Sequence, residues 1–114
     1  MRGMIVMKSS AVKPLDARNS IVSAKAGTKP TVKVSVREFA SINKPGAPIG
    51  VTWKLSEGKT VRATRQPQVP LGVDGWISFK VDYAVKKKTT YSLSVDANDV
   101  NGLTVHRTLT IKGV

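Results

Sequence analysis

Apolar and polar residues alternate along most of this chain of 114 residues. A period of two sends successive side chains to opposite faces of a strand, so each alternating stretch predicts a half-buried β-strand. The stretch at residues 103–111 keeps the alternation except at Arg107. β-Branched residues dominate these stretches, as is typical of strands, and no window shows a helical stripe. The alternating stretches are residues 31–37, 51–55, 77–81, 91–97 and 103–111.

Turn-forming residues separate the predicted strands. Gly and Asn tolerate positive φ angles and Pro presets a turn, so clusters of these residues mark the connections. The clusters are residues 26–30, 43–48, 56–59, 66–72, 73–75 and 98–102. A shorter strand at 60–64 and one or two near the N-terminus, at 4–8 and 20–25, bring the number to about seven. Short strands spaced in this way predict an all-β sandwich or barrel.

The inward positions of these strands define an expected core around one indole, that of Trp53. Its position in the middle of a strand suits the space between two sheets, where burial of an aromatic ring contributes a few kcal/mol at ~25 cal/mol per Å². We expect the core to contain Ile21, Val32, Val34, Val36, Val51, Trp53, Leu55, Ile77, Phe79, Val81, Tyr91, Leu93, Val95, Val105, Leu109 and Ile111.

The length fits one domain, which we place at residues 20–114. Residues 1–19 precede it and begin with an apolar group, Met4, Ile5, Val6 and Met7. This group is either a first strand of the sandwich or an arm that docks on the sheet edge of a partner. It is too short for the core of a secretion signal and is followed at once by Lys8. We therefore expect a protein used without secretion, or one whose leader has been removed.

The charge balance is strongly positive, with 19 Lys and Arg against 7 Asp and Glu and a formal net charge of +12. The excess is concentrated in the first two-thirds of the chain. Such a field favours polyanionic partners: an acidic protein surface, nucleic acid, an acidic glycan or an anionic membrane surface. A soluble surface rich in lysine is the plain alternative. No apolar run is long enough to span a membrane.

Two basic groups are the candidate contact residues. Lys86, Lys87 and Lys88 follow one another in a predicted loop, where they either bind an acidic partner or only keep the loop soluble. The second group surrounds a predicted hairpin, and alternation suggests that Lys54 and Arg62 share its outer face. Its members are Lys54, Lys59, Arg62 and Arg65.

Trp76 is a further candidate contact because it lies out of phase beside Ile77. An exposed Trp often anchors an interface, although burial under a neighbouring loop explains the position equally well. Nucleic-acid binding meets the electrostatic criterion with a pI of about 10.4. The expected core takes Trp53, Phe79 and Tyr91, and the two rings that could be exposed, Trp76 and Tyr83, do not make a stacking platform without a nearby basic-aromatic motif.

Catalytic and metal chemistry find little support in the sequence. There is no Cys and one His, His106, at an outward strand position, which excludes ordinary zinc sites and disulfides. No phosphate-binding glycine loop occurs. Asp96, Asn98 and Asp99 offer oxygen ligands for calcium, but such residues more often tie down a tight turn through their own side chains. We expect no enzyme, no cofactor and no metal.

The second half of the chain resembles a bacterial immunoglobulin-like domain. The resemblance rests on DGWISF at residues 74–79, TYSLSVDANDVNG at 90–102 and TLTI at 108–111. It is weaker in the first half, at residues 24–30 and 48–53, and the lysine-rich segment 86–90 departs from the family's small turn. The resemblance implies an immunoglobulin-like antiparallel β-sandwich of about seven strands in two sheets.

Such domains serve as adhesive or spacer repeats of bacterial cell-surface proteins, and as head-decoration or tail-associated proteins of bacteriophages. The first hypothesis is therefore a structural, non-enzymatic protein at the virion surface, docked on an acidic capsid or tail protein. This rests on an analogy of fold and on the short chain. The alternatives are a repeat at the bacterial cell surface and a basic binder of nucleic acid or glycan.

Overall fold

The computed structural model describes residues 20–114, and the described chain forms eight strands and one short 3₁₀ helix, Arg37–Ser41. The strands are β1 (Ser20–Ala24), β2 (Thr31–Ser35), β3 (Pro48–Glu57), β4 (Thr60–Arg65), β5 (Gln68–Pro70), β6 (Trp76–Lys80), β7 (Thr90–Asn98) and β8 (Thr104–Gly113).

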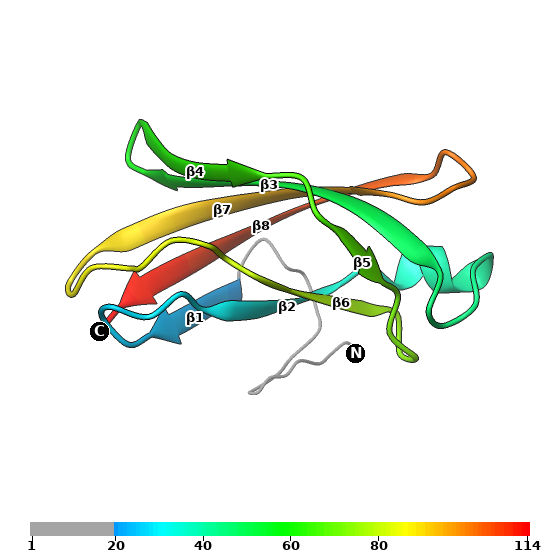
Figure 1. The fold of residues 1–114 in the computed structure, drawn as a ribbon, viewed down its shortest axis with the longest axis horizontal. Helices are drawn as coiled ribbons and strands as arrows, with labels where there is room; N and C mark the ends of the chain where they lie inside the picture. Colours follow the sequence, from blue (N-terminus) through cyan, green and yellow to red (C-terminus); the bar gives the residue numbers. More distant parts are fainter. Residues whose placement is uncertain (1–19) are drawn as a thin grey trace.

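The strands form two sheets, and the predicted β-sandwich is confirmed (Figure 1). The larger sheet has the order β1-β8-β7-β3-β4, with β5 also paired to β3, and the smaller sheet is β2-β6. The expectation of a wholly antiparallel sandwich was wrong at one pair, since β1 runs parallel to β8. The strand that follows β1 in sequence is β2, which belongs to the other sheet. β1 and β8 are therefore not joined by a hairpin turn, which would make them antiparallel. Eight strands are present within residues 20–114, where about seven were expected for the whole chain.

The strand order is that of an immunoglobulin fold. In that fold the strands named C, F and G form one sheet, and strands B and E belong to the sheet that faces it. Here β3, β7 and β8 are neighbours in the larger sheet, opposite β2 and β6. Strands that follow one another in sequence therefore often lie in different sheets, and their loops gather at the two ends of the sandwich (Figure 1).

The core matches the prediction except at Ile21, which is 61% exposed. β1 pairs Val22 with Ile111 and Ala24 with Gly113, and this register turns Ile21 outward beside Thr110. The sequence analysis missed buried residues that lie in loops, in short strands, in the 3₁₀ helix or at the start of β3, or that are small. They are Ala24, Phe39, Ile49, Ala63, Val69, Leu71, Val85 and Ala97.

Trp53 joins the two sheets, as expected. Its side chain on β3 is 1% exposed, and its ring stacks on that of Phe79 from β6 with the centroids 6.3 Å apart. Within residues 20–114 the indole Nε1 has no hydrogen-bond partner. In this part of the chain Trp53 is therefore held by apolar packing.

Arg107 breaks the alternation of β8 because it bridges the two layers. Its Nε donates to the carbonyl oxygen of Ser35 at 3.2 Å, and a terminal nitrogen lies 2.5 Å from Glu38 Oε2. Burial opposes ionisation of Glu38, but the hydrogen bond and the charge of Arg107 prevail and lower the pKa of this carboxyl group. One inward-facing arginine thus satisfies the free carbonyl at the end of β2.

Candidate binding surface

Three segments far apart in sequence are tied together at one end of the sandwich. Gly27 donates its backbone N–H to Val85 at 2.8 Å, and Val85 donates to Thr28 at 3.1 Å, so the loop after β1 and the loop before β7 lie side by side. The end of β8 joins them, since Lys88 donates to Gly113 at 2.9 Å. These bonds fix the positions of the lysines that the segments carry.

The β3–β4 hairpin adds a fourth segment through one carboxylate. Glu57 Oε1 lies 3.1 Å from Arg62 Nε and 3.8 Å from Lys86 Nζ. The structure therefore brings together the two basic groups that the sequence analysis kept apart. We call this region the basic end. Its cations are Lys25, Lys29, Lys59, Arg62, Lys86, Lys87, Lys88 and Lys112.

A second carboxylate, that of Asp82, lies next to the basic end. Its oxygens lie 3.1 Å from Lys29 Nζ and 3.3 Å from Arg65. The hydrogen bond and the charge of Lys29, with a smaller contribution from Arg65, lower the pKa of Asp82. Arg65 of β4 thus reaches the chain that follows β6, across the edge where the two sheets face each other.

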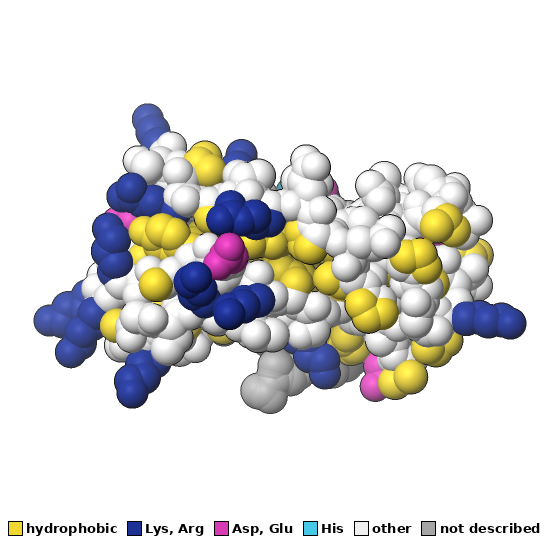
Figure 2. All heavy atoms as spheres, viewed as in Figure 1, with side chains coloured by type: hydrophobic (Ala, Val, Ile, Leu, Met, Phe, Trp, Pro, Cys, Tyr) yellow, Lys and Arg dark blue, Asp and Glu magenta, His cyan; other side chains and the backbone are white. Residues whose placement is uncertain are grey.

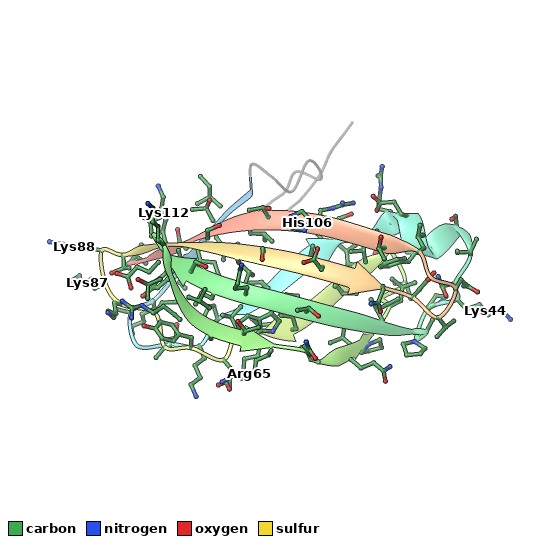
Figure 3. The ribbon with its side chains drawn as sticks, turned by 90° about the horizontal axis from the view of Figure 1, so that it is seen from above. Lys44, Arg65, Lys87, Lys88, His106 and Lys112 are labelled. Carbon is green, nitrogen blue, oxygen red and sulfur yellow. The ribbon has the colours of Figure 1, made fainter. Side chains whose placement is uncertain are left out.

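The remaining lysines of the basic end have no carboxylate partner among residues 20–114; they are Lys25, Lys59, Lys87, Lys88 and Lys112. Figure 2 shows the dark blue side chains crowded at this end with little magenta among them. Lys87, Lys88 and Lys112 lie together in Figure 3, and Lys44 lies at the opposite end. The described part of the fold thus concentrates positive charge that the acidic residues within 20–114 do not pair with.

Lys54 does not belong to this cluster. It lies on the outer face of the larger sheet, between Thr64 and Ser94 of the neighbouring strands. Arg62 falls at a β-bulge, between the pairs Leu55–Ala63 and Ser56–Val61. A bulge inserts an extra residue and interrupts the alternation. Both side chains are exposed, but with the bulge between them alternation alone does not place Lys54 and Arg62 on one face.

Trp76 is partly buried and lies away from the basic end. It pairs with Ser35 at one end of the small sheet, whereas the pair Thr31–Lys80 lies at the other, next to the basic loops. Lys33 Nζ lies 5.8 Å from the centre of the Trp76 ring. The ring is thus already in contact with a cation of its own domain. The candidate docking residues Met4, Ile5, Val6 and Met7 lie outside the described residues.

His106 has an oriented neighbour that the sequence analysis did not find. Asp96 lies directly opposite it on β7, with Asp96 Oδ1 2.6 Å from His106 Nδ1. Thr108 Oγ1 is 3.5 Å from the other ring nitrogen, which is longer than a good hydrogen bond. Both side chains are more than half exposed on an open sheet. The arrangement is a cross-strand hydrogen-bonded pair, and the register that creates it was invisible without the pairing of β7 and β8.

Both carboxylate oxygens of Asp99 accept hydrogen bonds, from its own turn and from Asn43. Oδ1 accepts the backbone N–H groups of Asn101 and Leu103, at 3.0 and 2.9 Å, and Oδ2 accepts the side-chain amide of Asn43 at 2.7 Å. Burial opposes ionisation of Asp99, but these hydrogen bonds together lower its pKa. The turn-forming role, favoured over calcium in the sequence, is the one observed. The part of the chain that the structure describes holds no group of three or more potential metal ligands.

No family model matches this chain, and no curated protein matches it either. Across residues 20–114, no helix has the length and the apolar composition needed to cross a membrane. The sequence analysis missed Lys25, Lys29 and Lys112 because they join the cluster only through the packing of distant segments.

Proposed function

We propose that this domain is a non-enzymatic binding module that docks on the acidic surface of a protein assembly through its basic end. One observation carries the proposal: four segments bring their cations to one end, where Glu57 and Asp82 are the only carboxylates paired with them among the described residues. Charge concentrated in this way raises the rate and the specificity of docking on a complementary surface.

Features of the basic end favour a protein partner over nucleic acid. Val61 and Val114 are exposed there, at 50% and 58%, and apolar side chains among lysines suit a protein interface. Its nearest rings are not exposed for stacking: Tyr91, which accepts the Lys86 N–H, is buried, and Tyr83 is partly buried and packs edge-on against it with the centroids 5.8 Å apart. Binders of single-stranded nucleic acid combine a basic groove with exposed aromatic rings on which bases stack. The described part of the basic end presents loop tips instead.

We propose, as the first hypothesis, that the protein assembly is a virion and that the partner is a capsid or tail protein. The resemblance to bacterial immunoglobulin-like domains supports this choice. Two contacts typical of immunoglobulin folds add to the support: Trp53 is buried on β3, and Tyr91, at the start of β7, accepts the backbone N–H of Lys86 at 2.9 Å. A repeat of a bacterial cell-surface protein, and a binder of nucleic acid or glycan, are the alternatives.

Isothermal titration with poly-L-glutamate at low salt tests the role of the basic end. Lys87, Lys88 and Lys112 are changed to Gln in one variant, and Lys33, Lys44 and Lys54 in the matched control. Both variants lose the same charge, so a non-specific effect of net charge weakens both equally. We expect the first variant to lose affinity roughly tenfold or more, and the control less than threefold.

The same titration with heparin and with duplex DNA separates the alternatives. Tighter binding of DNA or heparin than of poly-L-glutamate, with an affinity that falls steeply with salt, would favour the polyanion binder over the protein partner. Equal losses in the two triple variants would refute a localised basic site. For the virion, the genes that flank this one are expected to encode capsid or tail proteins, and flanking secretion or cell-wall genes would favour the cell-surface alternative.

A further inference from the structure

Lys88 has an unusual backbone conformation. Its φ angle is +59°, and it is the one non-glycine residue with positive φ among residues 20–114. The other positive φ angles in this part of the chain occur at glycines, such as Gly58 in the β3–β4 turn. A side chain in the left-handed region brings Cβ close to the backbone, which is why turns of this kind favour Gly or Asn. A lysine at this position opposes the local preference.

The surrounding fold holds the loop in place. Lys88 donates to the carbonyl of Gly113, and Gly113 donates in return to Thr89 at 2.8 Å. Lys86 donates to the hydroxyl oxygen of Tyr91 at 2.9 Å. A Cβ on Gly113 would lie only 1.8 Å from the carbonyl oxygen of Lys86, so the loop rests directly on the backbone of β8. These contacts stabilise a conformation that the lysine itself disfavours.

We infer that Lys86, Lys87 and Lys88 form a pre-organised contact for carboxylate groups of an acidic protein surface, and that Lys88 is retained in the left-handed region because its ammonium group binds there. The inference rests on the proposed function. It explains why a lysine stands where glycine fits the backbone better. A loop already fixed in the free protein loses less conformational entropy on binding than a mobile one, so each lysine contributes more affinity.

Carboxylates suit this loop because lysine presents a compact charge with three donors. The arginines near the basic end, Arg62 and Arg65, already contact Glu57 and Asp82. The ammonium groups of Lys87 and Lys88 make no such pair within the described chain. An acidic peptide segment laid across the loop would pair with both without displacing an internal ion pair.

Two single substitutions test the inference, Lys88→Gly and its matched control Lys87→Gly. Both remove one charge from the same loop, but glycine is favoured only where φ is positive. We expect Lys88→Gly to raise Tm by roughly 2–6 °C, and Lys87→Gly to lower Tm, since glycine at an ordinary position adds freedom to the unfolded chain. Each should weaken binding of poly-L-glutamate roughly threefold to tenfold at low salt.

Tyr91→Phe tests the pre-organisation separately, because it leaves every lysine in place and removes the acceptor of the Lys86 N–H. We expect a weaker affinity for poly-L-glutamate in a protein that still folds. An affinity unchanged in Lys88→Gly, or a lower Tm in that variant, would overturn the inference while leaving the basic end as the docking surface. A wild-type domain that binds no poly-L-glutamate would instead refute the proposed function and, with it, this inference.

Discussion

The two ends of the sandwich use charged residues in opposite ways. At the basic end, lysines crowd the loops and five of them have no carboxylate partner within residues 20–114. At the other end, the carboxylate of Asp99 is buried and accepts hydrogen bonds from the turn and from Asn43. That end also exposes Ile42, Val73 and Val100 in three separate loops.

The difference separates residues that hold the fold from residues that are available to a partner. A carboxylate that satisfies two backbone N–H groups stabilises its turn, so its loss should lower stability and leave binding unchanged. A lysine that no internal acid neutralises contributes little to folding, so its loss should lower binding and leave stability unchanged. The two ends should therefore respond to substitution in opposite ways.

Trp53→Ala should destabilise the core that supports both ends, so that the two ends no longer differ in their response. The indole is buried between the sheets against Phe79, so truncation should cost about 3–5 kcal/mol in the free energy of unfolding. Trp53→Phe should cost less, because it also removes the indole N–H that lacks a partner. Denaturant unfolding followed by circular dichroism measures both. If Trp53→Phe and Trp53→Ala lose the same free energy of unfolding, an aromatic ring at this position adds no stability. That result would contradict the role of apolar packing around the indole.

Gly113→Ala should damage the basic end alone. The new Cβ would clash with the backbone of Lys86, so either the loop moves or the strand bends, at a cost of about 1–3 kcal/mol. Gly102→Ala is the control for destabilisation at the other end: its added Cβ meets no atom within 4 Å, but its φ of +88° strains an alanine there. We expect only Gly113→Ala to weaken binding of poly-L-glutamate. A stable Gly113→Ala protein with unchanged binding would contradict the close packing of the loop on β8.

Acid should weaken the opposite end through Asp99. Its pKa is lowered in the folded protein, so the ionised carboxylate contributes stability above the unfolded pKa of about 4, and this stability is lost as the pH falls through the folded pKa. We expect the free energy of unfolding to decline below pH ~4. Asp99→Asn should lower stability at neutral pH and make this decline shallower, in denaturant titrations at several pH values. If the free energy of unfolding declines as steeply with acid in Asp99→Asn as in the wild type, Asp99 does not contribute to the decline.

His106→Ala should have the smallest effect. The side chain and its partner Asp96 are both exposed on the open face of the larger sheet, and exposed side-chain pairs contribute about 0–1 kcal/mol even when both partners are charged. The midpoint of denaturant unfolding should move little and binding of poly-L-glutamate should not change. A loss above ~2 kcal/mol would indicate that this pair has a structural role that its exposure does not suggest.

The strands were predictable from sequence because alternation reports local geometry. The stretches at residues 51–55 and 91–97 fell within β3 and β7, and the inward side chains of both are buried. The parallel pairing of β1 with β8 was not predictable, since it depends on which distant strands meet. Phe39 was missed because a 3₁₀ helix carries no period of two.

The candidate surface was only partly predictable for the same reason. Residues 86–88 form a run of charge that any composition analysis detects, whereas Lys25 and Lys112 join them only through backbone bonds between distant segments. The bulge in β4 interrupts the regular pairing, so alternation alone could not predict the face on which Arg62 lies. The left-handed conformation of Lys88 carries no sequence signal, because glycine is the residue expected there.

Amide chemical-shift mapping with poly-L-glutamate tests the docking surface most directly. The account predicts that the largest shifts fall in residues 25–30, 57–62, 84–89 and 111–114, which are far apart in sequence but share one end of the fold. Shifts concentrated in residues 42–47 and 98–103, or spread evenly over the domain, would contradict it.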